Sequence, residues 1–105
     1  MVNFRVEGDL SGNSPLHLAC IGGHAEIAEM LIRKMMANVD ITNAQGETAL
    51  HLSCREGHKG VIERLLLARA RTDIRDERFG NTPLHVLAQA NHQRVQTTVI
   101  SDTVR

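Results

Sequence analysis

A four-residue motif recurs at a fixed interval along this chain of 105 residues. It reads Ser14-Pro15-Leu16-His17, then Thr48-Ala49-Leu50-His51, and then Thr82-Pro83-Leu84-His85. The interval from one motif histidine to the next is 34 residues both times. A fixed period of this length, with one supersecondary unit in each period, is typical of a solenoid built from stacked repeats.

The similarity extends well beyond the motif when the chain is cut at the glycine that precedes each copy. The three segments read GNSPLHLACIGGHAEIAEMLI, GETALHLSCREGHKGVIERLL and GNTPLHVLAQANHQRVQTTVI, so a second histidine and a stripe of aliphatic residues also recur. We therefore treat the chain, residues 1–105, as one domain. Its repeats are expected at about 12–45, 46–79 and 80–101, with a partial hairpin at 1–11 and a tail at 101–105.

Each repeat is expected to contain two short helices. Ser14 and Thr48 suit helix N-caps because their hydroxyls can accept a backbone N–H, and Pro15 suits the first helical position. The third repeat should have the weakest second helix, because four β-branched residues occupy 97–100. The sequence predicts first helices at 15–21, 49–56 and 83–90, and second helices at 25–35 and 59–68.

The segments between repeats are spaced differently from the motifs. V-D-I-T at 39–42 and T-D-I-R at 72–75 look like matching hairpin strands, yet they are 33 residues apart. This difference predicts one additional residue near Met35-Met36 and another within the hairpin at 75–79. Neither second helix is followed by the usual glycine, because Met36 and Arg69 or Ala70 stand there instead, so a left-handed terminal residue would cost more.

The pattern resembles the ankyrin repeat through its T-P-L-H core, the following apolar run, the Gly-His pair and the V-x-x-x-L-L stripe. The resemblance covers residues 12–100. It implies an all-α solenoid of stacked helix-turn-helix units with short β-hairpin loops. It also implies that the motif histidines point inward and bond to backbone and to the Thr hydroxyl. The histidines of the Gly-His pairs would bond to neighbouring loop backbone.

Composition restricts the possible partners and the compartment. Twelve basic and twelve acidic residues give a formal net charge of zero, which argues against a nucleic-acid or anionic-membrane surface. No apolar run approaches the roughly 20 residues needed to cross a bilayer, and no signal-like segment opens the chain. We therefore expect a cytoplasmic or nuclear protein. Cys20 and Cys54 occupy equivalent positions about 8–10 Å apart, too distant for a disulfide, and should be buried thiols.

Two arrangements could suggest chemistry at a site. His17-x-x-Cys20 and His51-x-x-Cys54 place nitrogen and sulfur ligands three residues apart on a helix, and each motif places a hydroxyl beside a histidine. Both arrangements recur with the repeat, whereas an active site is normally a single asymmetric constellation. We therefore expect no metal site, no cofactor, no small-molecule substrate and no catalytic residue. Acids interleaved with Arg69, Arg71, Arg75 and Arg78 likewise predict a self-neutralising loop and not a phosphate site.

The resemblance instead implies a module that binds another protein through its hairpin tips and the exposed face of its first helices. Phe79 is the best candidate anchor, because it is a rare aromatic beside Arg78 at a tip; the alternative is that its ring folds onto its own hairpin. The matching positions are Leu10, Ser11, Asn13 and Ile21 in repeat one, Ala44, Gln45, Glu47, Arg55 and Glu56 in repeat two, and Arg78, Phe79, Asn81 and Gln89 in repeat three.

A second hypothesis is that the chain is a truncated fragment of a larger ankyrin-repeat regulator. Inhibitors of Rel-type transcription factors are one ankyrin group with this appearance. In that case the open ends of the stack would need more repeats, because three repeats bury little and should be stable by only a few kcal/mol. Cooperative urea unfolding with native-like helicity would support a self-standing module, and its absence would support a fragment.

Overall fold

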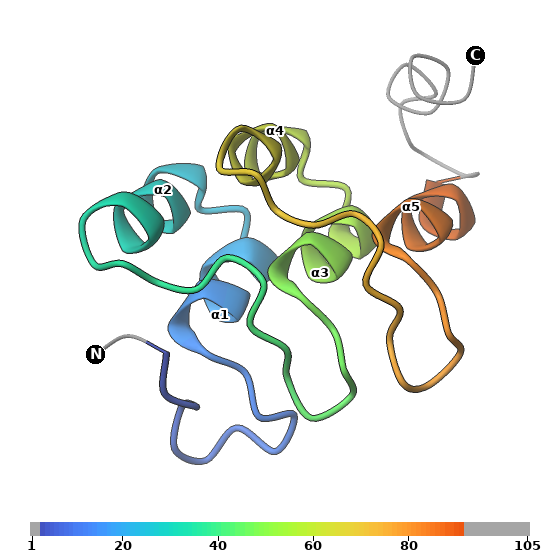
Figure 1. The fold of residues 1–105 in the computed structure, drawn as a ribbon, viewed down its shortest axis with the longest axis horizontal. Coiled ribbons are helices and arrows are strands. Elements are labelled where there is room, and N and C mark those ends of the chain that lie inside the picture. Colours follow the sequence, from blue (N-terminus) through green and yellow to red (C-terminus); the bar gives the residue numbers. More distant parts are fainter. Residues whose placement is uncertain (1–2, 92–105) are drawn as a thin grey trace.

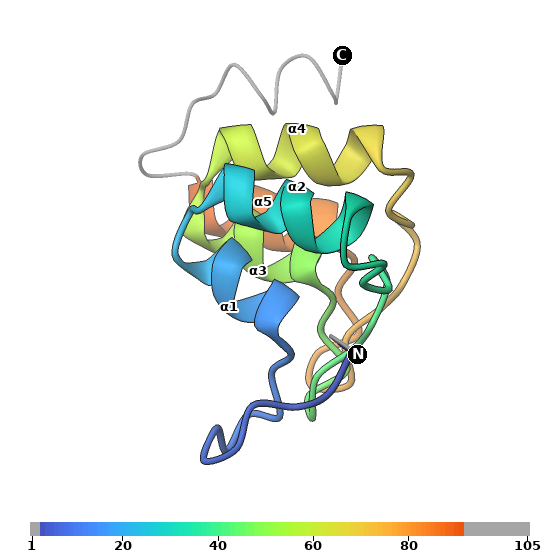
Figure 2. The same ribbon diagram turned by 90° about the vertical axis from the view of Figure 1, so that its left-hand side faces the viewer.

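A computed structural model describes residues 3–91 of the chain. This part contains five α-helices, namely α1 (Pro15–Ile21), α2 (Ala25–Arg33), α3 (Ala49–Glu56), α4 (Lys59–Leu67) and α5 (Pro83–Asn91). The helices form two layers, with α1, α3 and α5 in an inner layer and α2 and α4 in an outer layer (Figure 1). The connecting loops project from the inner layer on the side away from α2 and α4 (Figure 2). The structure thus has the all-α stacked architecture that the repeats predict.

Each inner helix begins where its cap predicts. Ser14 Oγ accepts the backbone N–H of His17 at 3.3 Å, and Ser14 N donates to His17 Nδ1 at 3.0 Å. Thr48 and His51 form the same pair of bonds at 3.3 and 3.0 Å. This is a capping box with histidine in place of the usual Glu or Gln, so two N-terminal amides are satisfied reciprocally. The recurring motif is therefore a helix-initiation signal.

The core lies between the layers and is built from medium-sized and small side chains. Leu16 and Leu65 are fully buried, and Cys20 and Cys54 occupy equivalent places in α1 and α3. Each fully buried leucine contributes on the order of 2 kcal/mol through removal of apolar surface from water. No aromatic ring belongs to the described core, in keeping with a stack only two helices thick. The remaining buried apolar members are Ala19, Ala28, Ala37, Ala49, Leu50, Val61, Ile62, Ala70 and Leu87.

The two outer helices end in left-handed residues that are not glycine, as the sequence predicts. Met36 has φ of 59° and Arg69 has φ of 66°. The helices themselves stop at Arg33 and Leu67, slightly before the predicted ends. After α4, Ala70 N donates to the carbonyl of Leu65, five residues back, whereas after α2 the equivalent Ala37 N donates to Leu31, six residues back. This wider closing turn contains the additional residue predicted near Met35-Met36.

The loops differ from the predicted β-hairpins. Within residues 3–91 no strand forms, because each loop is closed by isolated backbone bonds and not by a ladder. Val6 N donates to Asn13 O, Asn43 N to Glu47 O, and Asp76 N to Asn81 O. The third loop spans one residue more between its closing partners than the second, which confirms the additional residue predicted within 75–79.

None of the described helices is long and apolar enough to span a bilayer. Helix α5 ends at Asn91, one residue beyond its predicted end. The weak second helix predicted for repeat three and the tail at 101–105 lie outside the described residues.

Candidate protein-binding surface

Two of the recurring histidines join neighbouring repeats. The rings of His17 and His51 are 0% and 1% exposed. In each ring Nδ1 accepts the backbone N–H of the N-cap residue, so Nε2 carries the proton and donates onward. The acceptors are the carbonyls of Glu47, at 2.9 Å, and Asn81, at 2.8 Å, which lie 30 residues further along the chain. The prediction that these rings point inward to backbone and cap is confirmed, and both ring nitrogens are occupied.

Burial has an electrostatic consequence at the first of these rings. Loss of hydration lowers the pKa of His17 below its ordinary value, although the backbone carbonyl and the carboxylate of Glu47 oppose this shift. The ring is therefore held neutral in the folded protein. A neutral imidazole that carries its proton on Nε2 can act as a bridge between two repeats, which is the role its contacts show.

The other described histidines divide into two environments. His58 Nε2 approaches the carbonyl of Ile21 at 2.9 Å, as the resemblance implies for a Gly-His pair. This ring also fills the space that a side chain at Gly23 would need, since a Cβ there would lie 2.9 Å from the ring. His85 departs from the prediction, because it is exposed although its Nδ1 still lies 2.8 Å from Thr82 Oγ1. Among residues 3–91 no following loop supplies the carbonyl that covers its two equivalents.

The cysteines and histidines do not converge on a common point in the described part of the chain. No group of three or more potential metal ligands occurs among those residues. Cys20 and Cys54 are free and buried, and burial raises the pKa of each thiol to about 12. Thiols that stay protonated are poor nucleophiles and poor ligands, so both behave as small apolar side chains.

The three loops are tied into one row by backbone bonds between neighbours. Ala44 N of the second loop donates to Ser11 O of the first at 2.9 Å, and Glu77 N of the third donates to Gln45 O of the second at 2.8 Å. The close approach at the second joint requires glycine, because a Cβ at Gly46 would lie 2.7 Å from Glu77 Cγ. The tips therefore form a connected surface whose backbone is already ordered.

A polar hub organises the base of the second loop. Asn43 is buried, and its Nδ2 donates to Asn13 Oδ1 at 3.0 Å and to Glu47 Oε1 at 2.9 Å. Asn13 and Glu47 are only 6% and 8% exposed, so their side chains serve this internal network and not the outer surface as we expected. The sequence pattern did not reveal this, because loop position alone does not show which side chains turn inward. Arg55 Nη1 pairs with Glu47 Oε2 at 2.7 Å, while the Arg55 side chain remains 45% exposed.

The third loop has its own hub, which the sequence analysis did not single out. The carboxylate of Asp76 is buried and accepts the backbone N–H of Phe79 at 2.9 Å and of Asn81 at 3.2 Å. Although burial alone would raise the pKa of Asp76, these bonds together lower it below its usual value. The signal was available, since Asp76 stands where Asn43 stands in the second loop once the additional residue is allowed for. The ring of Phe79 is 72% exposed, so it does not fold onto its own loop.

The remaining predicted residues extend this surface from the tips along the inner helices. Gln45 lies at the second tip, and Arg78 lies beside Phe79, with its guanidinium 5.6 Å from the ring centroid. Inner helices that begin at the loops rise about 1.5 Å per residue, so their last residues lie roughly 10 Å from the loop bases. There Glu56 and Gln89 are exposed and Ile21 is half-buried, while Asn81 is half-buried at the base of the third loop.

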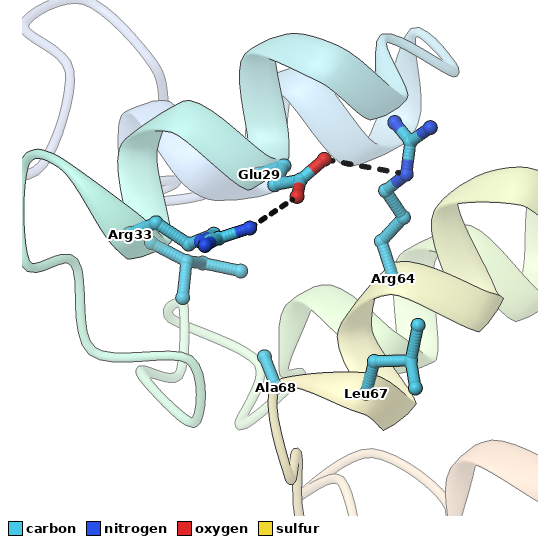
Figure 3. A pocket seen from close by; sticks show the side chains of 6 residues that line it. Glu29, Arg33, Arg64, Leu67 and Ala68 are labelled. Atoms are coloured by element: carbon cyan, nitrogen blue, oxygen red, sulfur yellow. Dashed lines mark hydrogen bonds and ion pairs between the residues drawn. The ribbon is translucent and has the colours of Figure 1, made fainter.

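Two hollows lie away from the tips. One, of about 390 Å³, lies between α2 and α4, where Glu29 pairs with Arg33 at 3.0 Å and with Arg64 at 3.4 Å (Figure 3). Its charges are already paired across the outer layer. The other, of about 230 Å³, is an apolar groove lined by Leu50, Cys54, Ile62, Leu66, Thr72, Pro83, Leu84 and Leu87.

Comparison with known families supports the repeat assignment. A family model described as ankyrin repeats, in three copies, matches residues 1–77, which is 77 of the 105 residues. A search of curated proteins finds no match for the chain.

Proposed function

This chain belongs to the ankyrin-repeat family, and we propose that it is a non-catalytic module that binds a partner protein through its loop tips and inner helices. Ankyrin repeats are generally protein–protein interaction modules and generally non-catalytic. The tip surface consists, in this proposal, of the three loop tips together with the exposed parts of α1, α3 and α5. Its members are Leu10, Ser11, Ile21, Ala44, Gln45, Arg55, Glu56, Arg78, Phe79, Asn81 and Gln89.

One observation carries the proposal, namely the division of work between recurring and non-recurring side chains. The recurring rings of His17 and His51 are buried and fully bonded, so they hold the stack together. Side chains that differ from loop to loop, such as Leu10 and Phe79, are 97% and 72% exposed. A surface whose side chains differ at every repeat can be specific for one partner, whereas a buried repeating set cannot recognise anything.

The order of the loop backbone also supports binding at the tips. Bonds from Ala44 to Ser11 and from Glu77 to Gln45 fix neighbouring loops relative to one another before any partner arrives. Association then loses less conformational entropy than it would with three independent flexible loops. The tip surface is therefore suited to rigid recognition more than to folding upon binding.

An affinity pull-down that compares two variants tests the proposal. The first carries Arg55→Ala and Phe79→Ala within the tip surface, and the control carries Leu67→Ala, whose side chain is 84% exposed on the outer layer. Proteins retained by wild type and by the control, but not by the double variant, would support the proposal once circular dichroism shows that all three proteins are equally folded. Equal retention by all three would contradict it.

A further inference from the structure

We infer that the partner offers an apolar pocket edged by a carboxylate, and that Phe79 and Arg78 of the third loop occupy this pocket and its edge. The inference rests on the proposed function and specifies the chemistry that the partner presents to one part of the tip surface.

The third loop differs from its neighbours in length. The second loop closes from Asn43 to Glu47 and the third from Asp76 to Asn81, one residue more. The stretch Glu77-Arg78-Phe79 therefore has only Ala44-Gln45 as its counterpart in the second loop. The additional residue places a large ring on a tip where the neighbouring loop carries small or polar side chains.

The additional length does not leave the tip loose. Asp76 accepts the backbone N–H of Phe79 at 2.9 Å, and Arg75 Nη1 donates to Gly80 O at 2.9 Å, so the segment is held from both sides. Glu77 N is bonded to Gln45 O of the second loop. An exposed ring on an ordered backbone has only its own side-chain rotation to lose on binding, as expected of a binding hot spot.

The ring and its neighbour define the chemistry of the complementary site. Phe79 is 72% exposed, and a partner must supply an apolar pocket to remove it from water. The Arg78 guanidinium lies 5.6 Å from the ring centroid, so the pocket that takes the ring also brings this charge to its edge. Burial near an apolar pocket raises the cost of an unpaired charge, and a carboxylate at the pocket edge offsets that cost with paired hydrogen bonds.

The acids of this region are mostly engaged elsewhere, contrary to the self-neutralising loop that the sequence suggests. Asp73 pairs with Arg71 at 2.9 Å, and the Asp76 carboxylate is turned inward to backbone amides. No ion pair to Arg78 occurs among residues 3–91. The Arg78 charge therefore remains available to a partner, and it favours an acidic over a basic one.

Selection from a random dodecapeptide library tests the inference with a defined probe. Immobilised wild-type protein is used for selection, and the Phe79→Ala/Arg78→Glu variant is used to remove peptides that bind elsewhere. The surviving peptides should carry Asp or Glu close to an apolar cluster. For each one, fluorescence polarisation should show at least a tenfold loss of affinity for Phe79→Ala. Surviving peptides that are basic, or the absence of any survivor, would overturn the inference.

A charge exchange separates recognition from general damage. Arg78→Glu should weaken a selected peptide at least tenfold, and replacing the acidic residue of that peptide with Arg should restore most of the lost affinity. Phe4→Ala provides the matched control, because Phe4 is 55% exposed outside the third loop, and it should leave affinity unchanged. Failure of the exchange would overturn the inference.

The two proposals fail differently. Peptides or partners that lose affinity with Arg55→Ala but not with Phe79→Ala or Arg78→Glu would leave the proposed function standing and refute this inference. Ligands that lose affinity only with Leu67→Ala on the outer layer would refute both.

Discussion

Replacing Met36 and Arg69 with glycine should make the protein more stable, although both changes remove a side chain. Both residues have positive φ, 59° and 66°, where an L side chain costs about 1–2 kcal/mol. Glycine avoids this cost but loses about 0.5–1 kcal/mol more backbone entropy on folding. Met36 is 78% exposed and Arg69 is exposed, so little buried surface is lost. The net expectation is a gain of about 0.5–1 kcal/mol for each change.

Urea unfolding followed by circular dichroism measures this gain directly. The two residues close different helices, so the double variant should gain about 1–2 kcal/mol. For a domain of this size that gain corresponds to a rise in Tm of roughly 5–10 °C. Lys34→Gly provides the matched control, because Lys34 has φ of −98° and has no left-handed strain to relieve. This control should lose about 0.5–1 kcal/mol.

A loss of stability in both Met36→Gly and Arg69→Gly, similar to that of Lys34→Gly, would refute the reasoning. It would mean that the left-handed residues are not the termination points of α2 and α4. An unchanged urea midpoint would equally contradict it, since the expected gain exceeds the error of a two-state fit to matched variants.

Three further predictions concern the recurring residues. Because burial lowers the pKa of His17, its contribution should be complete above pH 6.5 and lost as pH falls below that value, so Tm should decrease between pH 7.5 and 5; a flat profile would exclude this. His51→Ala should cost about 3 kcal/mol in urea unfolding, because it leaves a cavity and an unpaired carbonyl at Asn81, whereas His85→Ala at an exposed ring should cost less than about 1 kcal/mol; equal costs would refute the bridging role. Cys20 and Cys54, with thiol pKa values raised to about 12 by burial, should react with Ellman's reagent only in urea, and rapid reaction of the native protein would contradict their burial.

The inner layer could be predicted from the sequence almost residue by residue. Ser14, Pro15 and Thr48 are local signals whose meaning depends on a few neighbouring backbone groups, so their helices begin where predicted. Comparison of the spacing of two patterns also located both additional residues. It succeeded because a residue added to one connection changes one spacing and leaves the other intact.

The side chains at the loop bases and at the end of the described stack were harder to predict. Asn13 and Glu47 sit in loop positions that suggest exposure, yet Asn43 draws both into a buried network through contacts that only the folded loop creates. His85 has the same local sequence as its equivalents, but burial depends on what stacks against it, and that is not encoded in the motif. Exposure of Phe79 likewise required the structure, because the sequence left its ring free to fold either way.

Chemical-shift mapping on ¹⁵N-labelled protein, with a partner from the pull-down or a selected peptide, tests the central claim most directly. If recurring side chains build the stack and non-recurring tip side chains recognise the partner, the largest changes should fall on Gln45, Arg78 and Phe79. The indole-free, fully bonded interior around His17 and His51 should then change little. Changes concentrated at those two rings, or on the outer helices α2 and α4, would contradict the account.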